Sequence, residues 1–340
     1  MTTFRIIAAL AILVAAAAGQ TITLRNLATM PEHVDESSGV EMLDENRLLT
    51  HNDSGGEAEL YLIDTLGNDL GTIRVTNATN RDWEELAQSP DGRIFIGDFG
   101  NNANSRTDLR IYIIPHPDSL EGDSAEAEIL YFWYPDQTGF PPPDSLMNFD
   151  MEGMFYFRDS LYLFSKNRTD PFDGYTKMYS LPAVPGSTAA NLLDSFYLSP
   201  DGFGGIVTAA DIAPDGSRIV LMAYNFIALF SGFSGADFFS GDFSGFALSS
   251  VTQKEAICFI DSYQFFATDE AYYYGDIRFN GNLYREDLSP YLGFTRDQKI
   301  RAPLDFTIEP NPFNSSCKMK LSGGSRLEIF SVDGRRIDMI

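Results

Sequence analysis

Five stretches of the chain share one pattern, and this repetition limits the fold more than any other feature of the sequence. In each, a small or acidic pair leads into a short apolar strand, a tight turn, a second apolar strand and a polar cluster. The turns use residues suited to tight turns, such as Pro90-Asp91-Gly92 and Pro214-Asp215-Gly216. The sequence therefore predicts five antiparallel hairpins, over residues 38–55, 81–102, 150–168, 209–225 and 254–271.

Further strands follow these hairpins. A third apolar strand is expected at residues 58–64, 108–114, 176–182, 226–232 and 281–287, and a weaker fourth at 71–77, 128–134, 194–200 and 245–251. Four strands in each repeated unit are typical of propeller blades. No window keeps a helical period for three turns. We predict an all-β fold, a five- or six-bladed β-propeller of four-stranded blades, with a β-sandwich as the competing fold.

The fifth unit has no evident fourth strand. Residues 21–27 alternate as a strand does and have no hairpin partner nearby, so we expect them to supply this outer strand and close the ring. A sixth, degenerate blade within 285–305 is the alternative. The Phe-Ser-Gly-rich run 229–246 is interpreted as strands and turns of the fourth unit, with an aromatic platform for a ligand as the alternative.

The charge balance excludes some classes of function. The 340 residues contain 24 Lys and Arg against 48 Asp and Glu, a formal net charge of −24. This balance argues against nucleic-acid binding, which requires a cationic surface. It leaves carboxylates available for hard cations. The two cysteines, Cys258 and Cys317, make no disulfide framework, and Cys258 lies in an apolar run that predicts burial.

The N-terminal residues 1–19 have the features of a signal peptide. Arg5 precedes an apolar run from Ile6 to Ala18, and small residues near Gly19 fit a cleavage site. The run is shorter than the roughly 20 residues that a permanent membrane helix needs. No later segment is long and apolar enough to be transmembrane. We expect a monomer that is secreted or held at the outer-membrane surface, with the propeller spanning 20–304.

Acidic and amide residues occur at both ends of the predicted hairpins. In a blade the first strand lines the channel and the second returns antiparallel to it, so the start of the first and the end of the second share one face. The first position carries Asp82, Glu84, Asp150, Glu152, Asp211 and Glu255. The second carries His51, Asp53, Asp98, Asn101, Asn102, Lys166, Arg168, Asn225, Asp269 and Glu270.

Such a ring of like charges costs free energy to assemble. Pairing with basic side chains relieves the repulsion, and so does Ca²⁺, which takes six to eight oxygen ligands. The three histidines show no zinc-site spacing. We predict Ca²⁺ as the cofactor and, as its candidate ligands, Asp53, Asp82, Glu84, Asp98, Asn101, Glu152 and Glu255. Candidate ligand-binding residues are His51, Asn102, Lys166, Arg168, Asp211, Asn225, Asp269 and Glu270.

Each of these residues also has a structural interpretation. The sequences around Asp53, Asp98 and Asn101 form good turns by themselves. The two basic residues, Lys166 and Arg168, are then needed only to neutralise neighbouring acids. The recurrence of an acid at the same place in four units is what favours a site.

Four motifs resemble a group of secreted bacterial propeller proteins, most of them without an assigned function. The motifs are "HNDSGGEAELYLID", "RDWEELA", "IGDFGNN" and "LRIYIIP", and the resemblance covers roughly residues 35–285. More distantly, the chain is similar to phytase-like propellers and to calcium-dependent phosphotriesterase or lactonase propellers. The distant resemblance implies a divalent metal in the channel mouth and transfers no nucleophile.

The tail, residues 305–340, resembles the start of a type IX secretion sorting domain. The resemblance rests on Pro310-Asn311-Pro312-Phe313-Asn314, the strand Leu327–Phe330 and Asp333-Gly334-Arg335-Arg336. It implies a partial β-sandwich and the type IX secretion machinery as a partner. The family usually continues for several more strands, so we expect a partial sorting domain, either because the sequence is a fragment or because the signal is shortened.

Two functions are compatible with this sequence. One is a non-catalytic propeller that binds a small molecule, a glycan or a protein at its acidic channel face. The alternative is a metal-dependent hydrolase of phosphoesters or lactones, with Glu84 or Glu152 as general base. The sequence has no Gly-x-Ser-x-Gly elbow to indicate a serine hydrolase. We favour binding, because the acidic ring has no recognisable nucleophile.

Overall fold

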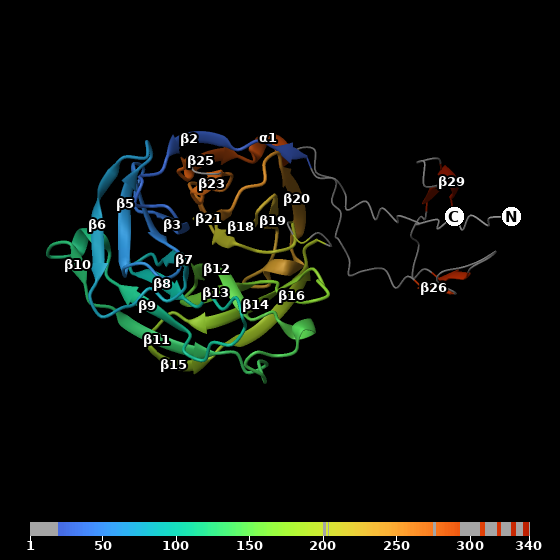
Figure 1. The fold of residues 1–340 in the computed structure, drawn as a ribbon, viewed down its shortest axis with the longest axis horizontal. Helices are drawn as coiled ribbons and strands as arrows, with labels where there is room; N and C mark the ends of the chain where they lie inside the picture. Colours follow the sequence, from blue (N-terminus) through green and yellow to red (C-terminus); the bar gives the residue numbers. More distant parts are fainter. Residues whose placement is uncertain are drawn as a thin grey trace. The chain divides into compact units, whose positions relative to one another are not determined.

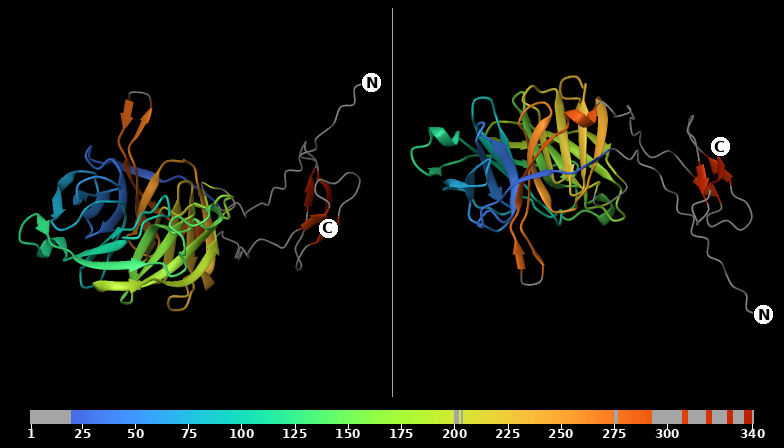
Figure 2. Two further views of the ribbon diagram at one scale, coloured as in Figure 1. Left: turned by 60° about the horizontal axis from the view of Figure 1, so that its bottom comes forward. Right: turned by 90° about the horizontal axis from the view of Figure 1, so that it is seen from above.

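The computed structural model describes residues 20–199, 202, 204–274 and 277–292, and four short strands near the C-terminus (Figures 1 and 2). The chain divides into two units, residues 18–299 and a smaller unit that contains residues 300–340. The predicted signal peptide, Cys317 and the Pro310–Asn314 motif lie outside the described residues. No helix among the described residues is long and apolar enough to cross a membrane.

The larger unit is a five-bladed β-propeller, as Figure 1 shows. The first blade contains β3 (Ser37–Met42), β4 (Arg47–Asn52), β5 (Glu59–Asp64) and β6 (Asp69–Val75). The second contains β7 (Trp83–Gln88), β8 (Ile94–Asp98), β9 (Arg110–Ile114) and β11 (Glu128–Trp133), and the third β12 (Asp150–Phe157), β13 (Ser160–Lys166), β14 (Tyr175–Pro182) and β16 (Asn191–Tyr197).

The fourth blade contains β17 (Ala209–Ile212), β18 (Arg218–Ala223), β19 (Phe226–Ser231) and β20 (Asp242–Leu248). The fifth contains β21 (Lys254–Phe259), β22 (Gln264–Asp269), β25 (Asn282–Asp287) and β2 (Arg25–Thr29). Each blade is antiparallel, and its first strand lies innermost. The prediction of a propeller is confirmed. The β-sandwich alternative is wrong, and so is a sixth blade over residues 285–292, which hold the end of β25 and α1 (Ser289–Leu292).

The N-terminal segment joins the two ends of the ring. β1 (Thr21–Ile22) pairs in parallel with β20, and β2 pairs antiparallel with β25, so that Arg25 lies opposite Arg285. The predicted closing strand is present, and part of it also extends the fourth blade. Two other short strands extend blades in the same way, β10 (Ser124–Ala125) on β6 and β15 (Gly186–Ala189) on β11. These additions pair strand edges that would otherwise be open.

The smaller unit shows two short antiparallel hairpins among its described residues. β26 (Thr307–Glu309) pairs with β27 (Lys318–Lys320), and β28 (Glu328–Phe330) pairs with β29 (Arg336–Met339). The strand predicted at Leu327–Phe330 corresponds to β28. Whether this unit is a sorting domain stays a prediction.

Aromatic residues of the Phe-rich run pack inside the propeller. Phe238, in the short 3₁₀ turn Phe238–Ser240, is fully buried and packs edge-to-face on Phe155 and Tyr162, with ring centroids 5.3 and 5.0 Å apart. Aromatic pairs in this arrangement stabilise a core beyond the area they bury. The run therefore fills the seam between the third and fourth blades. Cys258 is buried too, as predicted.

Candidate functional site

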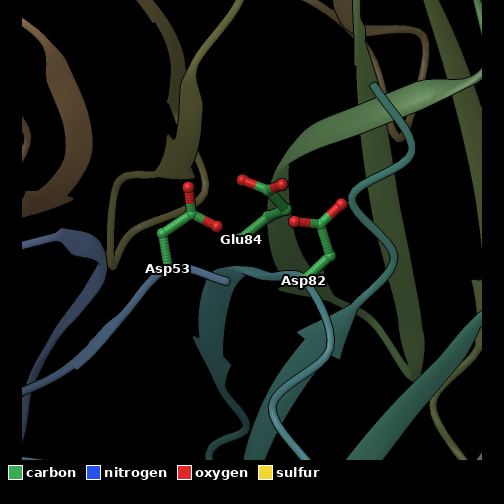
Figure 3. A group of neighbouring side chains, drawn as sticks. All are labelled: Asp53, Asp82 and Glu84. Carbon is green, nitrogen blue, oxygen red and sulfur yellow. The ribbon is translucent and has the colours of Figure 1, made fainter. Parts of the chain in front are cut away.

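Three carboxylates from two blades meet at the mouth of the channel (Figure 3). Asp53 directly follows β4, Asp82 directly precedes β7, and Glu84 lies on β7. One carboxylate oxygen of each lies within 4.8 Å of those of the other two. A second group, Glu84 with Asp150 and Glu152 of β12, meets the same criterion. The two groups share Glu84, so the first three blades contribute to one continuous site.

A β-bulge at the start of three innermost strands explains how the glutamates reach this site. The strand register shifts between Trp83 and Glu85, between Met151 and Gly153, and between Lys254 and Ala256. The residue inside each shift is a glutamate. A bulge inserts one residue into a strand and redirects its side chain. We call the combined carboxylates the acidic mouth; its members are Asp53, Asp82, Glu84, Asp150, Glu152, Glu255 and Glu270.

Basic side chains neutralise one side of the acidic mouth. Lys166 Nζ lies 3.0 Å from Glu152 Oε2 and 3.8 Å from Glu255 Oε2. Arg168 Nε lies 2.7 Å from Asp150 Oδ2, and its Nη2 lies 3.5 Å from Glu152 Oε1. The side formed by the third and fifth blades is therefore compensated by protein charges.

The opposite side of the mouth has no such ion pair. Among the described residues, no basic nitrogen lies within ion-pair distance of Asp53, Asp82 or Glu84. Lys166 acts on Asp53, and Arg106 and Arg168 act on Asp82, only from farther away. The Asp53 Oδ1 atom is buried and has no hydrogen-bond partner there. A buried carboxylate without a partner is costly, and the protein must neutralise it with a proton or a cation.

The pKa values of these acids respond to this environment. Burial, together with the nearby Asp82 and Glu255, raises the pKa of Asp53 to about 7. Burial and the neighbouring Asp150 raise the pKa of Asp82 to about 6. Burial, followed by the Glu152 carboxylate, raises the pKa of Glu84 well above its usual range. Without a cation, the mouth would hold protons at neutral pH.

Gly100 allows the loop after β8 to approach these carboxylates. A Cβ atom at this position would lie 2.6 Å from Asp82 Cγ and closer still to Glu84 Oε1. The Gly100 N–H donates to the Asp82 carbonyl oxygen at 3.1 Å. A side chain there would push these two carboxylates aside, so glycine leaves their positions free and the backbone forms this wall of the site. The sequence analysis did not single out Gly100.

Asp98 and Asn101 have other partners in this loop. Asp98 is fully buried and pairs with Arg106 Nη2 at 2.8 Å and Arg110 Nε at 3.4 Å. Asn101 Oδ1 accepts from the backbone N–H groups of Ser105 and Arg106, at 2.8 and 2.9 Å. Their side chains hold the loop in shape and do not join the carboxylate groups at the mouth.

Three further predicted residues also lie apart from the acidic mouth. His51 is buried edge-on to Trp83, 5.6 Å between centroids, and burial lowers its pKa to about 4. Asp211 accepts from the backbone N–H of Phe259 at 2.6 Å. Asp269 accepts from the Tyr284 hydroxyl at 2.6 Å. These contacts stabilise the packing of neighbouring strands.

Of the remaining predicted residues, Asn102 and Asn225 border the mouth and Glu270 belongs to it. Asn102 Oδ1 accepts from the Arg168 guanidinium. Asn225 Oδ1 is buried without a hydrogen-bond partner among the described residues. Burial, then Glu255 and Asp53, raise the pKa of Glu270 to about 8. The preceding residue of the fourth blade, Tyr224, places its ring 5.4 Å from Lys166 Nζ, and sequence reasoning missed it because no repeat position marks it.

Comparisons with known proteins give only distant structural similarity. No protein-family model and no curated protein matches the chain. A PQQ-bound aldose sugar dehydrogenase from Streptomyces coelicolor aligns with a TM-score of 0.45 at 12% identity, over 79% of this chain and 99% of that chain. A glucose dehydrogenase aligns at 0.44 and 9%, over 78% and 99%. A gluconolactonase from Xanthomonas campestris aligns at 0.40 and 11%, over 79% and 86%.

Proposed function

We propose that this protein binds a divalent cation, Ca²⁺ in preference to others, at the acidic mouth, and that the occupied mouth recognises an oxygen-bearing ligand. The observation that carries the proposal is the uncompensated group of Asp53, Asp82 and Glu84. The Glu84–Asp150–Glu152 group is the weaker candidate, because Lys166 and Arg168 already neutralise it.

The donor atoms favour calcium. All three side chains offer carboxylate oxygens, and His51 is buried elsewhere. Hard oxygen donors suit Ca²⁺, which takes six to eight of them, whereas zinc sites use nitrogen and sulfur. Three carboxylates leave positions for water and for an oxygen of the ligand. Asp82 and Asp53 are only partly buried, so this group is open to solvent.

Calcium titration of the metal-depleted protein tests the proposal. We expect one site by calorimetry and a higher melting temperature, since a saturating ligand at 100 times its Kd stabilises by about 2.7 kcal/mol. Glu84→Gln should weaken calcium binding at least roughly tenfold, because the charge of the ligand set determines affinity. The same change should leave the metal-free protein as stable as before or more stable, since it removes a repelling charge.

Glu121→Gln is the matched control, because Glu121 is exposed on a loop of the second blade. It should bind calcium like the unchanged protein. A melting temperature of the unchanged protein that does not move with calcium, together with no calcium binding in calorimetry, would remove the cation from the proposal.

Hydrolysis of phosphoesters or lactones is the second candidate function. Its support is Glu152, a buried carboxyl with a pKa raised by burial, next to the cation group. A bound cation would supply Lewis-acid polarisation of a substrate oxygen. Glu152 would accept the proton of the attacking water. Binding remains the better supported function, because Lys166 and Arg168 occupy the Glu152 oxygens.

A panel of phosphoester and lactone substrates separates the two functions. We expect no turnover above background with calcium bound. Turnover that Glu152→Gln abolishes, while calcium affinity stays unchanged, would establish the hydrolase instead. Export by the predicted signal peptide and sorting tail belongs to the proposal and rests on sequence alone.

A further inference from the structure

A two-stranded hairpin leaves the propeller beside the acidic mouth. β23 (Tyr272–Tyr274) and β24 (Ile277–Phe279) pair antiparallel, with Tyr272 opposite Phe279, and pair with no other strand among the described residues. Figure 2 shows this hairpin, in orange, standing out from the blades. It follows Glu270 of the mouth in the chain, so its base borders that site.

The base of the hairpin is fixed to the segment before the first blade. The Ala271 N–H donates to the Asp35 carbonyl oxygen at 2.7 Å. The Arg278 guanidinium donates to the Glu32 carbonyl oxygen at 2.6 Å and pairs with the carboxylates of Glu32 and Asp35, at 3.2 and 3.5 Å. These contacts fix the base of the hairpin relative to residues 32–35, and the carboxylates of Glu32 and Asp35 neutralise the positive charge of Arg278.

The hairpin exposes an aromatic pair to solvent. Tyr272 and Phe279 are 47% and 42% exposed, and their rings stack at 4.9 Å and 10°. Covering apolar surface of this kind with a partner removes it from water, which favours binding. Among the described residues no further strand pairs with the outer edges of β23 and β24, so these edges can pair with another extended chain.

The charges around the hairpin indicate which charge a partner must carry. Side chains of Glu32 and Asp35 are 83% and 48% exposed at its base, and Glu270 lies next to it. The whole chain carries a formal charge of −24. A second copy of this chain would place acids against acids. A basic partner is attracted instead, and electrostatic complementarity increases both its specificity and its association rate.

We propose that the strands β23 and β24 of this hairpin dock an extended, basic segment of another polypeptide. The segment pairs along an open strand edge, packs an apolar side chain on Tyr272 and Phe279, and places Lys or Arg side chains against Glu32, Asp35 and Glu270. Adding a strand to an exposed edge is a general mode of peptide recognition. This binding goes beyond the proposed function and does not require the cation.

Fluorescence polarisation with labelled peptides tests the proposal. The probe is a decapeptide of alternating Lys and Val, compared with a Glu and Val peptide and with a Lys peptide containing prolines. Proline removes the backbone donor that strand pairing needs. We expect only the first peptide to bind, and we expect salt to weaken its binding. Removing calcium should leave the affinity of the protein for the peptide unchanged. A ligand that binds at the acidic mouth would instead bind more weakly without calcium.

Paired variants locate the contact. The double change Tyr272→Ala and Phe279→Ala should weaken binding by roughly tenfold or more, as for aromatic anchors at other interfaces. Its control is Tyr131→Ala with Trp133→Ala, two residues 45% and 49% exposed on the outer strand of the second blade. The control should bind like the unchanged protein.

Three results would each overturn the proposal. The first is equal binding of the acidic and basic peptides by the unchanged protein, a comparison that needs no variant to fold. The second is unaltered binding in a Tyr272 and Phe279 variant of normal melting temperature. The third is self-association in sedimentation that this variant abolishes, since the occupant would then be a second copy.

Discussion

The carboxylates of the mouth determine how stability depends on pH. Burial raises the pKa of Asp53 to about 7 and that of Asp82 to about 6, so the folded, metal-free protein binds protons that the unfolded chain has released. Stability must then fall as pH rises from about 4 to about 7, because the folded state holds more protons throughout that range. We expect calcium to replace those protons when it binds and so to remove the fall.

Melting temperatures of metal-depleted protein between pH 5 and 8 measure this effect. We expect a decline with pH that calcium suppresses, and a smaller decline in Asp53→Asn. Asp118→Asn is the control, because the Arg47 guanidinium lowers the pKa of exposed Asp118 and this acid lies outside the mouth. An identical decline in Asp53→Asn would show that another group titrates.

At the scale of elements, the sequence predicted strands well and their irregularities poorly. The predicted third strands of all five blades and fourth strands of the first four lie within three residues of the observed ones, because turn residues and apolar runs are local signals. The bulges at Glu84, Glu152 and Glu255 arise from pairing between strands and leave no local signal. The parallel strands β10 and β15 were missed because distant partners position them. The hairpin β23–β24 was missed because each of its strands has only 3 residues, too few for a clear pattern.

The same distinction applies to the candidate site. Its location on one face followed from the antiparallel order of strands, so Glu84 and Glu152 could be placed together in advance. The role of each individual acid could not be predicted from the sequence. Asp98 occurs in the same repeat position as Asp53, yet Arg106 and Arg110 neutralise it, because the loop from 99 to 109 folds back over its own strand. Loop geometry of this kind is not encoded in a repeat.

For the whole molecule, closure of the ring determines whether the blades unfold together. Ile22 is fully buried at the seam between the fourth and fifth blades, with Phe246 and Ile257. A large-to-small change in such a core costs about 2–5 kcal/mol. Repeat proteins without closure unfold from their ends, whereas a closed ring has no free end. Ile22→Ala should therefore destabilise every blade and not only those at the seam.

The two tryptophans make this measurable, because Trp83 and Trp133 both lie in the second blade, away from the seam. We expect urea unfolding of Ile22→Ala to shift tryptophan fluorescence and far-UV circular dichroism to the same lower midpoint. Leu66→Ala, at a residue 73% exposed in a turn of the first blade, should shift neither. If circular dichroism shifts while the tryptophan midpoint stays in place, the blades unfold separately, and the N-terminal strands stabilise only the blades that they touch.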